Sequence, residues 1–208
     1  AATGGYAAEA KPSAALIGAK GEVPAGHGKK SEQASTTPES IVDFPDGSRA
    51  PVSMFSARFD GSEMEQKFRK VHELLVAHKF DNLMVSVSGG GDFGEKTLEY
   101  LGRLDEERGV MLAVCTENYG EMTDSEYSSN RELKFALDQK LHVIPLRVVE
   151  MYPPRPPFGL EHPFDKTGTA KTLVKMVLPP SKVYLDCRNQ SAEQIARLIA
   201  DQLLAKAK

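Results

Sequence analysis

The chain has 208 residues, a formal net charge of -3, 40% hydrophobic residues, 26% charged residues and two cysteines. No apolar run approaches the roughly 20 residues that a membrane-spanning helix needs, and the near-neutral charge offers no basic field for binding DNA or RNA. Cys115 and Cys187 lie far apart without a CxxC pair, which predicts neither a disulfide framework nor a cysteine metal site and favours a reducing compartment such as the cytoplasm.

Residues 1–50 differ in composition from the rest of the chain. Between positions 1 and 40 the large apolar side chains are few: Tyr6, Leu16, Ile17 and Val23. They bury too little surface to offset an ordering entropy of roughly 1–2 kcal/mol per residue. We therefore expect this N-terminal extension to be disordered alone and to become ordered on a partner, such as a large protein assembly. It contains neither an apolar signal core nor an Arg-rich transit pattern, although the missing initiator methionine leaves processing and organelle import open.

From Pro51 onward, short apolar runs alternate with helical patterns. This alternation predicts one α/β domain over residues 51–208, with a parallel sheet flanked by helices. Strands are expected at 52–56, 83–87, 110–115, 142–146 and 183–185. Apolar residues at helical spacing predict helices over 62–75, 98–108, 133–137, 173–178 and 191–206.

Capping patterns and prolines mark the ends of several elements. Ser62 with Glu65, and Ser191 with Gln194, have the Ser-x-x-Glu/Gln spacing of a capping box, which predicts where the first and last helices begin. Five prolines between positions 153 and 163 forbid a regular helix there. We expect that segment to be an extended loop.

Three stretches of the sequence carry a family resemblance. They are MFSAR at 54–58, LAVCTENY at 112–119, and SSNREL at 128–133 continued by VIPL at 143–146. In this order they resemble the opening strand, the third strand with its loop, and the "WCxxEL…VIPV" block of Toll/interleukin-1 receptor (TIR) domains, over roughly residues 51–206. The resemblance implies a flavodoxin-like fold of five parallel strands. It also implies association with protein partners or with further copies of the chain.

Glu132 occupies the position of the catalytic glutamate in TIR domains that cleave NAD. Breaking the bond between nicotinamide and ribose builds positive charge on the sugar, which a carboxylate stabilises or traps covalently. Nicotinamide leaves as a neutral ring, so no general acid is required. The resemblance thus implies an NAD hydrolase with Glu132 as catalytic residue, NAD as substrate, and no tightly bound cofactor or metal. Alternatively, Ser129 and Glu132 form a capping box at a helix start.

A glycine-rich loop follows the second predicted strand. Gly89, Gly91 and Gly94 have the G-x-G-x-x-G spacing of a dinucleotide-binding turn, in which glycines let the backbone approach a pyrophosphate at a helix N-terminus. Glu117, after the next strand, would then bond ribose hydroxyls. These residues support a second hypothesis, a Rossmann-type oxidoreductase or nucleotide-binding module. In TIR domains the corresponding loop mediates self-association or gates the pocket, and a glycine loop without ligand contacts is a third interpretation.

Arg58 follows the first predicted strand. From there its guanidinium would reach a dinucleotide phosphate. The alternative is an exposed arginine that pairs with Asp60 or Glu63. Arg58 is therefore a candidate cofactor-binding residue.

A non-catalytic role is the remaining hypothesis. Ala57, Ser128 and Ser129 stand where TIR domains usually have Tyr, Trp and Cys. These differences, together with the N-terminal extension, favour a scaffold, an adaptor or an accessory subunit of a large protein assembly. Cys115 ends the third predicted strand without a His-Asp pair, so we expect a buried thiol and not a nucleophile.

Overall fold

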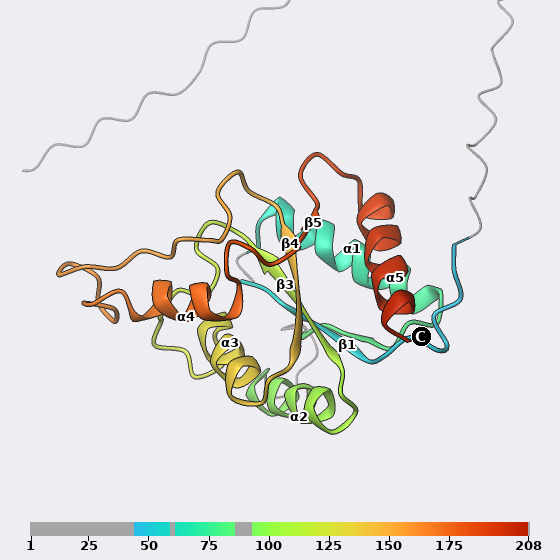
Figure 1. Ribbon diagram of the computed structural model, residues 1–208, viewed down its shortest axis with the longest axis horizontal. Helices are drawn as coiled ribbons and strands as arrows, with labels where there is room; N and C mark the ends of the chain where they lie inside the picture. The colour runs from blue at the N-terminus through green and yellow to red at the C-terminus, as the bar shows by residue number, and fades with distance from the viewer. Residues whose placement is uncertain (1–43, 59–60, 86–92, 208) are drawn as a thin grey trace, which may run out of the picture. The chain divides into compact units, whose positions relative to one another are not determined.

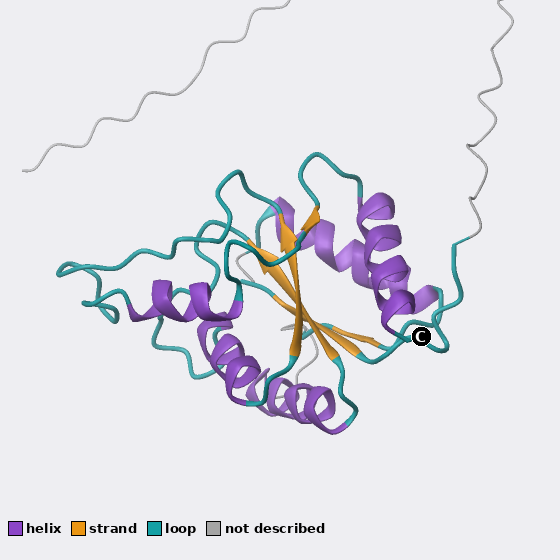
Figure 2. Cartoon of the chain, in the orientation of Figure 1, coloured by secondary structure: helices purple, strands orange, loops and turns teal. Residues whose placement is uncertain are grey.

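The computed structural model describes residues 44–58, 61–85 and 93–207. Within them lies a sheet of five strands: β1 (Ser53–Ser56), β2 (Asn82–Leu83), β3 (Val110–Cys115), β4 (His142–Arg147) and β5 (Leu185–Asp186). All neighbouring strands pair in parallel, in the order β2-β1-β3-β4-β5 (Figures 1 and 2). This is the strand order of flavodoxin-like folds, so the predicted α/β fold class is confirmed.

Helices cover both faces of the sheet. In the described part of the chain they are α1 (Glu63–Ala77), α2 (Phe93–Glu106), α3 (Ser129–Asp138), α4 (Thr169–Val177) and α5 (Ala192–Lys206). Helices α1 and α5 lie on one face, and α2, α3 and α4 lie on the other (Figure 1). Because successive strand residues point to opposite faces, Phe55 packs with α1 and α5, whereas Met54 packs with the other three helices. None of the described helices is long and apolar enough to cross a membrane.

The capping patterns place the first and last helices correctly. Ser62 is the N-cap of α1, and its hydroxyl accepts a hydrogen bond from the backbone N–H of Glu65. At the start of α5, Ser191 and Gln194 form both bonds of a capping box. Strand β3 also has the predicted bounds. Local sequence signals therefore determine these ends well.

The second strand is shorter than predicted. Strand β2 ends at Leu83, and Met84 and Val85 are buried without pairing to β1. The rest of the predicted strand 83–87 lies outside the described residues. A short strand at the edge of a sheet exposes few unpaired backbone groups. The apolar run after Leu83 is buried without being part of the strand, and apolar composition alone does not distinguish these two cases.

The fifth strand begins later than predicted. Leu185 pairs with Leu146 of β4, and this is where β5 starts. Val183 lies two residues earlier and is 86% exposed. Its apolar, β-branched side chain favours a strand by composition, but no neighbouring strand reaches that position among the described residues.

Residues 44–50 lie on the domain, although the sequence assigns them to the N-terminal extension. The Phe44 ring stacks on His78 with 4.2 Å between ring centroids, and it packs against the core beneath α1. The backbone N–H of Gly47 donates to the carbonyl of His78 at 2.9 Å, and Lys79 pairs with Asp46 at 2.7 Å. This short segment is therefore anchored to the end of α1, and residues 1–43 lie outside the described residues.

We expect Phe44→Ala to lower the free energy of unfolding by about 1–2 kcal/mol, because it removes a half-buried aromatic ring from the core. Thermal unfolding followed by circular dichroism measures this change. Arg49→Ala, an exposed change in the same segment, is the matched control and should have little effect. Equal unfolding midpoints for both variants would mean that the segment contributes nothing to stability.

The loop between β4 and α4 contains neither helix nor strand, as its prolines predict. It ends in a cap supplied by Asp165, which is 1% exposed. The Asp165 carboxylate accepts hydrogen bonds from the backbone N–H groups of Gly168 at 2.8 Å and of Thr169 and Ala170 at 2.9 Å. Burial would raise the pKa of Asp165, but these N–H groups outweigh burial and lower it. The start of α4 is thus held by a buried anion.

Candidate functional site

A cleft lies at the carboxyl edge of the sheet, where the chain turns to opposite faces. The connection after β1 leads to α1 on one face, and the connection after β3 leads to α3 on the other. The two loops part at this switch point, which is where open parallel sheets bind ligands. The cleft has a volume of about 200 Å³ and is lined by the two loops and by the starts of α2 and α3.

The Glu132 carboxylate lies directly behind the wall of this cleft. Its Oε2 accepts a hydrogen bond from the hydroxyl of Ser56, the last residue of β1, at 2.5 Å. Ser56 precedes Ala57, and Glu132 lies one helical turn after Ser128. Both Ala57 and Ser128 line the cleft. Glu132 itself is 3% exposed, so its carboxylate is buried next to the cleft and is not part of the lining.

Glu132 does not cap its own helix. Ser128, not Ser129, is the N-cap residue of α3, and it makes no side-chain capping bond. The Ser129 hydroxyl instead accepts a hydrogen bond from the backbone N–H of Gly120 at 3.1 Å. The alternative interpretation of Ser129 and Glu132 as a capping box is therefore wrong, because both side chains bond to other segments of the chain.

Burial shifts the acidity of this carboxyl group. Removal from water raises the pKa of Glu132 to about 7, and the hydrogen bond from Ser56 opposes that rise. Among the described residues no Lys, Arg or His forms an ion pair with it. At neutral pH the group is consequently present in both its charged and its neutral forms.

Arg58 lines the cleft and pairs with Glu121 of the loop after β3. Glu121 also contacts Nε2 of His162, from the β4–α4 loop, at 3.3 Å. Nδ1 of His162 accepts the backbone N–H of Asp165 at 2.8 Å, so Nε2 carries the proton and donates to Glu121. The loops after β1, β3 and β4 are thereby joined at one edge of the cleft, an arrangement that the sequence did not indicate.

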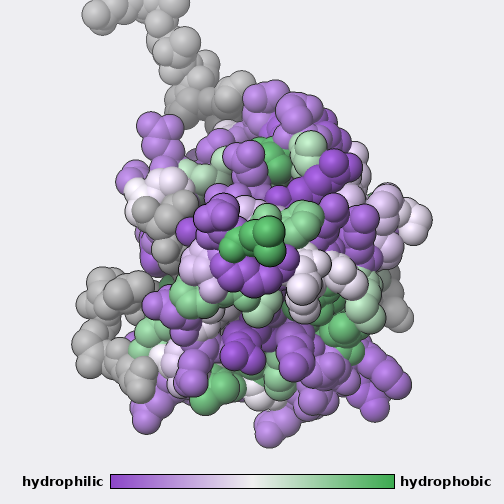
Figure 3. Space-filling model, turned by 90° about the vertical axis from the view of Figure 1, so that its left-hand side faces the viewer, coloured by the Kyte–Doolittle hydropathy of each residue, from purple (hydrophilic) through white to green (hydrophobic). Residues whose placement is uncertain are grey.

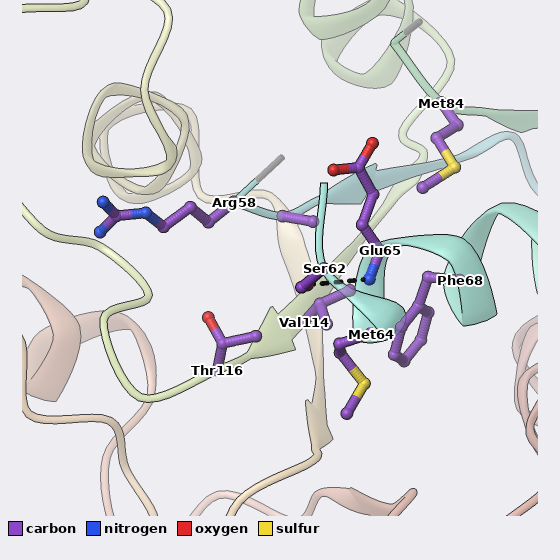
Figure 4. A pocket seen from close by; sticks show the side chains of 9 residues that line it. Arg58, Ser62, Met64, Glu65, Phe68, Met84, Val114 and Thr116 are labelled. Atoms are coloured by element: carbon purple, nitrogen blue, oxygen red, sulfur yellow. Dashed lines mark hydrogen bonds between the residues drawn. The ribbon is translucent and has the colours of Figure 1, made fainter. Parts of the chain in front are cut away.

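A second, smaller hollow lies on the other side of the β1–α1 loop (Figure 4). It has a volume of about 10 Å³, which is room for one water molecule. Its lining includes Phe68, Met84 and Val114, and Arg58 extends away from these apolar side chains (Figure 4). The guanidinium of Arg58 therefore belongs to the larger cleft, and the small hollow lacks room for a substrate.

Gly94 allows close packing behind the cleft. It is buried in the first turn of α2, and a Cβ atom there would lie 2.3 Å from the ring of Tyr127. Tyr127 itself lines the cleft. A glycine at this position is thus explained by contact with a protein side chain, whereas the sequence suggested contact with a phosphate.

We expect Gly94→Ala to displace the Tyr127 ring and to lower the free energy of unfolding by about 1–2 kcal/mol, since the added methyl group overlaps the ring. Gly102→Ala in the same helix is the matched control, because a Cβ atom there meets nothing within 4 Å. That control should be neutral or should stabilise the protein by up to about 1 kcal/mol. Chemical denaturation of both variants measures the difference, and identical midpoints would argue against the steric explanation.

The other predicted cofactor-binding residues do not join the cleft in the described structure. Glu117 lies in the turn after β3, where its side chain is exposed, and it is not among the cleft residues. Gly89 and Gly91 lie outside the described residues. The structure therefore brings Arg58, Glu132 and the Tyr127 ring, which packs on Gly94, to the same edge of the sheet. Glu117 is not part of this group.

The cysteines are both free and buried. Burial raises the pKa of the Cys115 thiol, which keeps it protonated and unreactive, as expected of a buried thiol. In the described part of the chain, no group of three His, Cys, Asp or Glu side chains is placed to hold a metal ion.

No protein-family model matches the sequence, and a search of the curated proteins finds none that is similar. Two observations bear on function. Short motifs of the sequence resemble those of TIR domains, and the fold places Arg58 in the cleft and Glu132 next to it, near the carboxyl ends of β1 and β3.

Proposed function

We propose that this domain is a TIR-like NAD hydrolase in which Glu132 is the catalytic carboxylate. The hydrogen bond from Ser56 to Glu132 is the observation that carries the proposal. The Glu132 carboxylate makes no capping bond to the start of its own helix α3. It bonds instead to the end of β1, beside a cleft. Burying an acid without a cationic partner costs stability, and acids with perturbed pKa values gather at functional sites.

The proposed reaction needs a single carboxylate. As the bond between nicotinamide and ribose breaks, the bonding electrons leave with the cationic nicotinamide ring, which becomes neutral. The ribose carbon becomes electron-poor, and the negative charge of Glu132 stabilises it or forms a bond to it until water attacks. For this contact the carboxylate must turn past Ala57 and Ser128 into the cleft.

Arg58 provides a site for the pyrophosphate of NAD. Its side chain is 40% exposed and is neutralised by Glu121 in the absence of substrate. A phosphate group offers two oxygens to a guanidinium in a strong bidentate pair and would replace that carboxylate. The cleft volume of about 200 Å³ is below the roughly 300–1,000 Å³ of ordinary small-molecule sites. We therefore propose that association with a second copy or another protein completes the site.

The test is chromatographic. Purified protein is incubated with NAD over a range of protein concentrations, and nicotinamide and ADP-ribose are quantified. We expect both products in equal amounts, with a rate that rises more steeply than the protein concentration if association completes the site. Nicotinamide at the level of the protein-free blank, at every concentration, would contradict the proposal.

A non-catalytic scaffold is the second candidate, and the near-complete burial of Glu132 favours it. The β4–α4 loop also exposes four large apolar side chains, of Met151, Phe158, Leu160 and Phe164. Figure 3 shows that apolar surface on this side of the molecule forms small areas among polar side chains. Such areas suit a transient protein contact better than an obligate interface.

The Rossmann-type alternative has weaker support. Strand β2, which precedes the glycine motif, is at the edge of the sheet, whereas a dinucleotide-binding turn normally follows the strand at the switch point. Glu117, the proposed ribose ligand of that alternative, is exposed outside the cleft. Appearance of reduced nicotinamide with an alcohol or hydroxy acid would support this alternative over NAD cleavage.

A further inference from the structure

Three buried side chains from separate parts of the chain meet behind the cleft. Ser56 at the end of β1 and Tyr119 in the loop after β3 are both 0% exposed, and Glu132 in the first turn of α3 is 3% exposed. The Ser56 hydroxyl lies 2.5 Å from Oε2 of Glu132 and 2.7 Å from the hydroxyl of Tyr119. Glu132 is thus hydrogen-bonded to the Ser56 hydroxyl, which is in turn hydrogen-bonded to the Tyr119 hydroxyl.

When Glu132 is charged, the number of available protons fixes the direction of this chain of hydrogen bonds. A charged carboxylate only accepts, and a serine hydroxyl has one proton to donate. Because Ser56 donates that proton to Glu132, its oxygen accepts from the phenol of Tyr119. Tyr119 therefore fixes the rotation of the Ser56 hydroxyl, and each donor strengthens the next.

No other charge in the described surroundings explains how Glu132 is held. The titratable neighbours on the strand side are Tyr119 and Cys115, and burial raises the pKa of both so that they stay neutral. On the cleft side, Arg58 pairs with Glu121. The remaining favourable contribution is the N-terminal end of α3, where Glu132 lies in the first turn.

We infer that Ser56, oriented by Tyr119, is a positioning residue that stabilises the charged form of the Glu132 carboxylate and holds it at the end of β1, next to the cleft. The inference rests on the proposed function for its catalytic consequence, but the arrangement of the three side chains is independent of any activity. Ser56 does not touch the substrate; it acts through Glu132.

Ser56→Ala is the central variant, Ser56→Thr restores a hydroxyl, and Tyr119→Phe removes the outer donor. Ser53→Ala is the matched control. Ser53 is also a buried serine of β1, and it accepts a hydrogen bond from Asn82 at 2.9 Å. It faces α1 instead of α3, so this change removes a buried hydrogen bond from the same strand and leaves Glu132 untouched.

The first measurement is the pKa of Glu132, followed by NMR of the ¹³C-labelled carboxyl group and assigned with Glu132→Gln. Loss of a donor to the charged form disfavours that form, so Ser56→Ala should raise the pKa of Glu132 by about one pH unit. Tyr119→Phe should raise it less, and Ser56→Thr and Ser53→Ala should leave it near its value of about 7 in the wild type.

The second measurement is the pH profile of nicotinamide release. At pH 7, Ser56→Ala should turn over NAD about fivefold more slowly with an unchanged KM, because only about a tenth of Glu132 would be charged instead of about half. Raising the pH should restore the rate, which a loss of stability alone would not allow.

The outcomes separate this inference from the proposed function. An unchanged Glu132 pKa in Ser56→Ala, or an equal change in Ser53→Ala, overturns the positioning role whether or not NAD is cleaved. Conversely, a raised pKa in a protein that never releases nicotinamide supports the arrangement and overturns only the proposed activity.

Discussion

Glu132→Gln is expected to reduce nicotinamide release from NAD by at least about 100-fold and to leave the domain folded. The glutamine keeps the size of the side chain and an oxygen that accepts the Ser56 hydroxyl proton, but it cannot carry the negative charge that the sugar requires in the transition state. Removing one electrostatic group from such a site typically costs about 100-fold to 1,000-fold in rate. Because glutamine need not ionise in a buried position, the unfolding midpoint should stay equal or rise.

Glu117→Gln is the matched control for this experiment. It makes the same chemical change at an exposed glutamate near the end of β3, and it should retain the wild-type rate. Retained cleavage in Glu132→Gln would remove the electrostatic role of Glu132. A loss of cleavage in Glu117→Gln would support a role in NAD binding for Glu117 and the glycines of the dinucleotide-binding pattern.

Asp165→Ala is expected to have the largest effect on stability of the changes considered, lowering the free energy of unfolding by about 2–3 kcal/mol. The variant leaves backbone N–H groups at the start of α4 without their buried acceptor, and hydrogen bonds to charged groups are stronger than neutral ones. For a domain of this size the loss corresponds to about 4–12 °C in Tm. Asp186→Ala removes an exposed aspartate that pairs with Arg188 and should cost at most about 1 kcal/mol.

The contribution of Asp165 should also depend on pH. Its pKa in the folded protein is below the ordinary value of 3.8, so folding favours the charged form. The stabilisation is therefore complete above that ordinary value and is lost as the pH falls through the folded pKa. The difference in Tm between wild type and Asp165→Ala should be constant near neutral pH and should shrink in acid. A difference that persists unchanged at low pH would point to packing, not charge.

The sequence predicted those elements of the fold whose local pattern of apolar or capping residues agrees with their burial in the structure. The apolar run of β3 and the capping box at Ser191 needed no information from the rest of the chain. Val183 shows the opposite case, since its β-branched side chain favours a strand but no strand of the described residues pairs with it, and it is exposed. The same limit applies to Phe44, whose surrounding segment has the composition of a disordered tail. Ring stacking on His78, a backbone hydrogen bond from Gly47 and an ion pair of Asp46 nevertheless attach this segment to the end of α1.

The site was predictable only in part. The motif resemblance indicated Glu132, and the place of Arg58 after the first strand indicated Arg58. Their partners Ser56 and Glu121 are 76 and 63 residues away from them in sequence. Only the folded sheet brings the ends of β1 and β3 together. A weak signal for Ser56 does exist, because a hydroxyl at the end of a buried strand needs a hydrogen-bond partner. Which partner it finds depends on the helix that follows β3.

The two serines of β1 give this strand a register that its apolar residues alone would not specify. Met54 and Phe55 face opposite sides of the sheet, and both faces are apolar, so sliding the strand by one residue would still bury a large side chain on each side. Ser53 and Ser56 differ, since one hydroxyl has its partner on β2 and the other has its partner on α3. A one-residue slip would turn each serine toward the wrong face of the sheet and would leave both hydroxyls without hydrogen-bond partners. Two small polar side chains thereby exclude an alternative pairing that hydrophobic packing would tolerate.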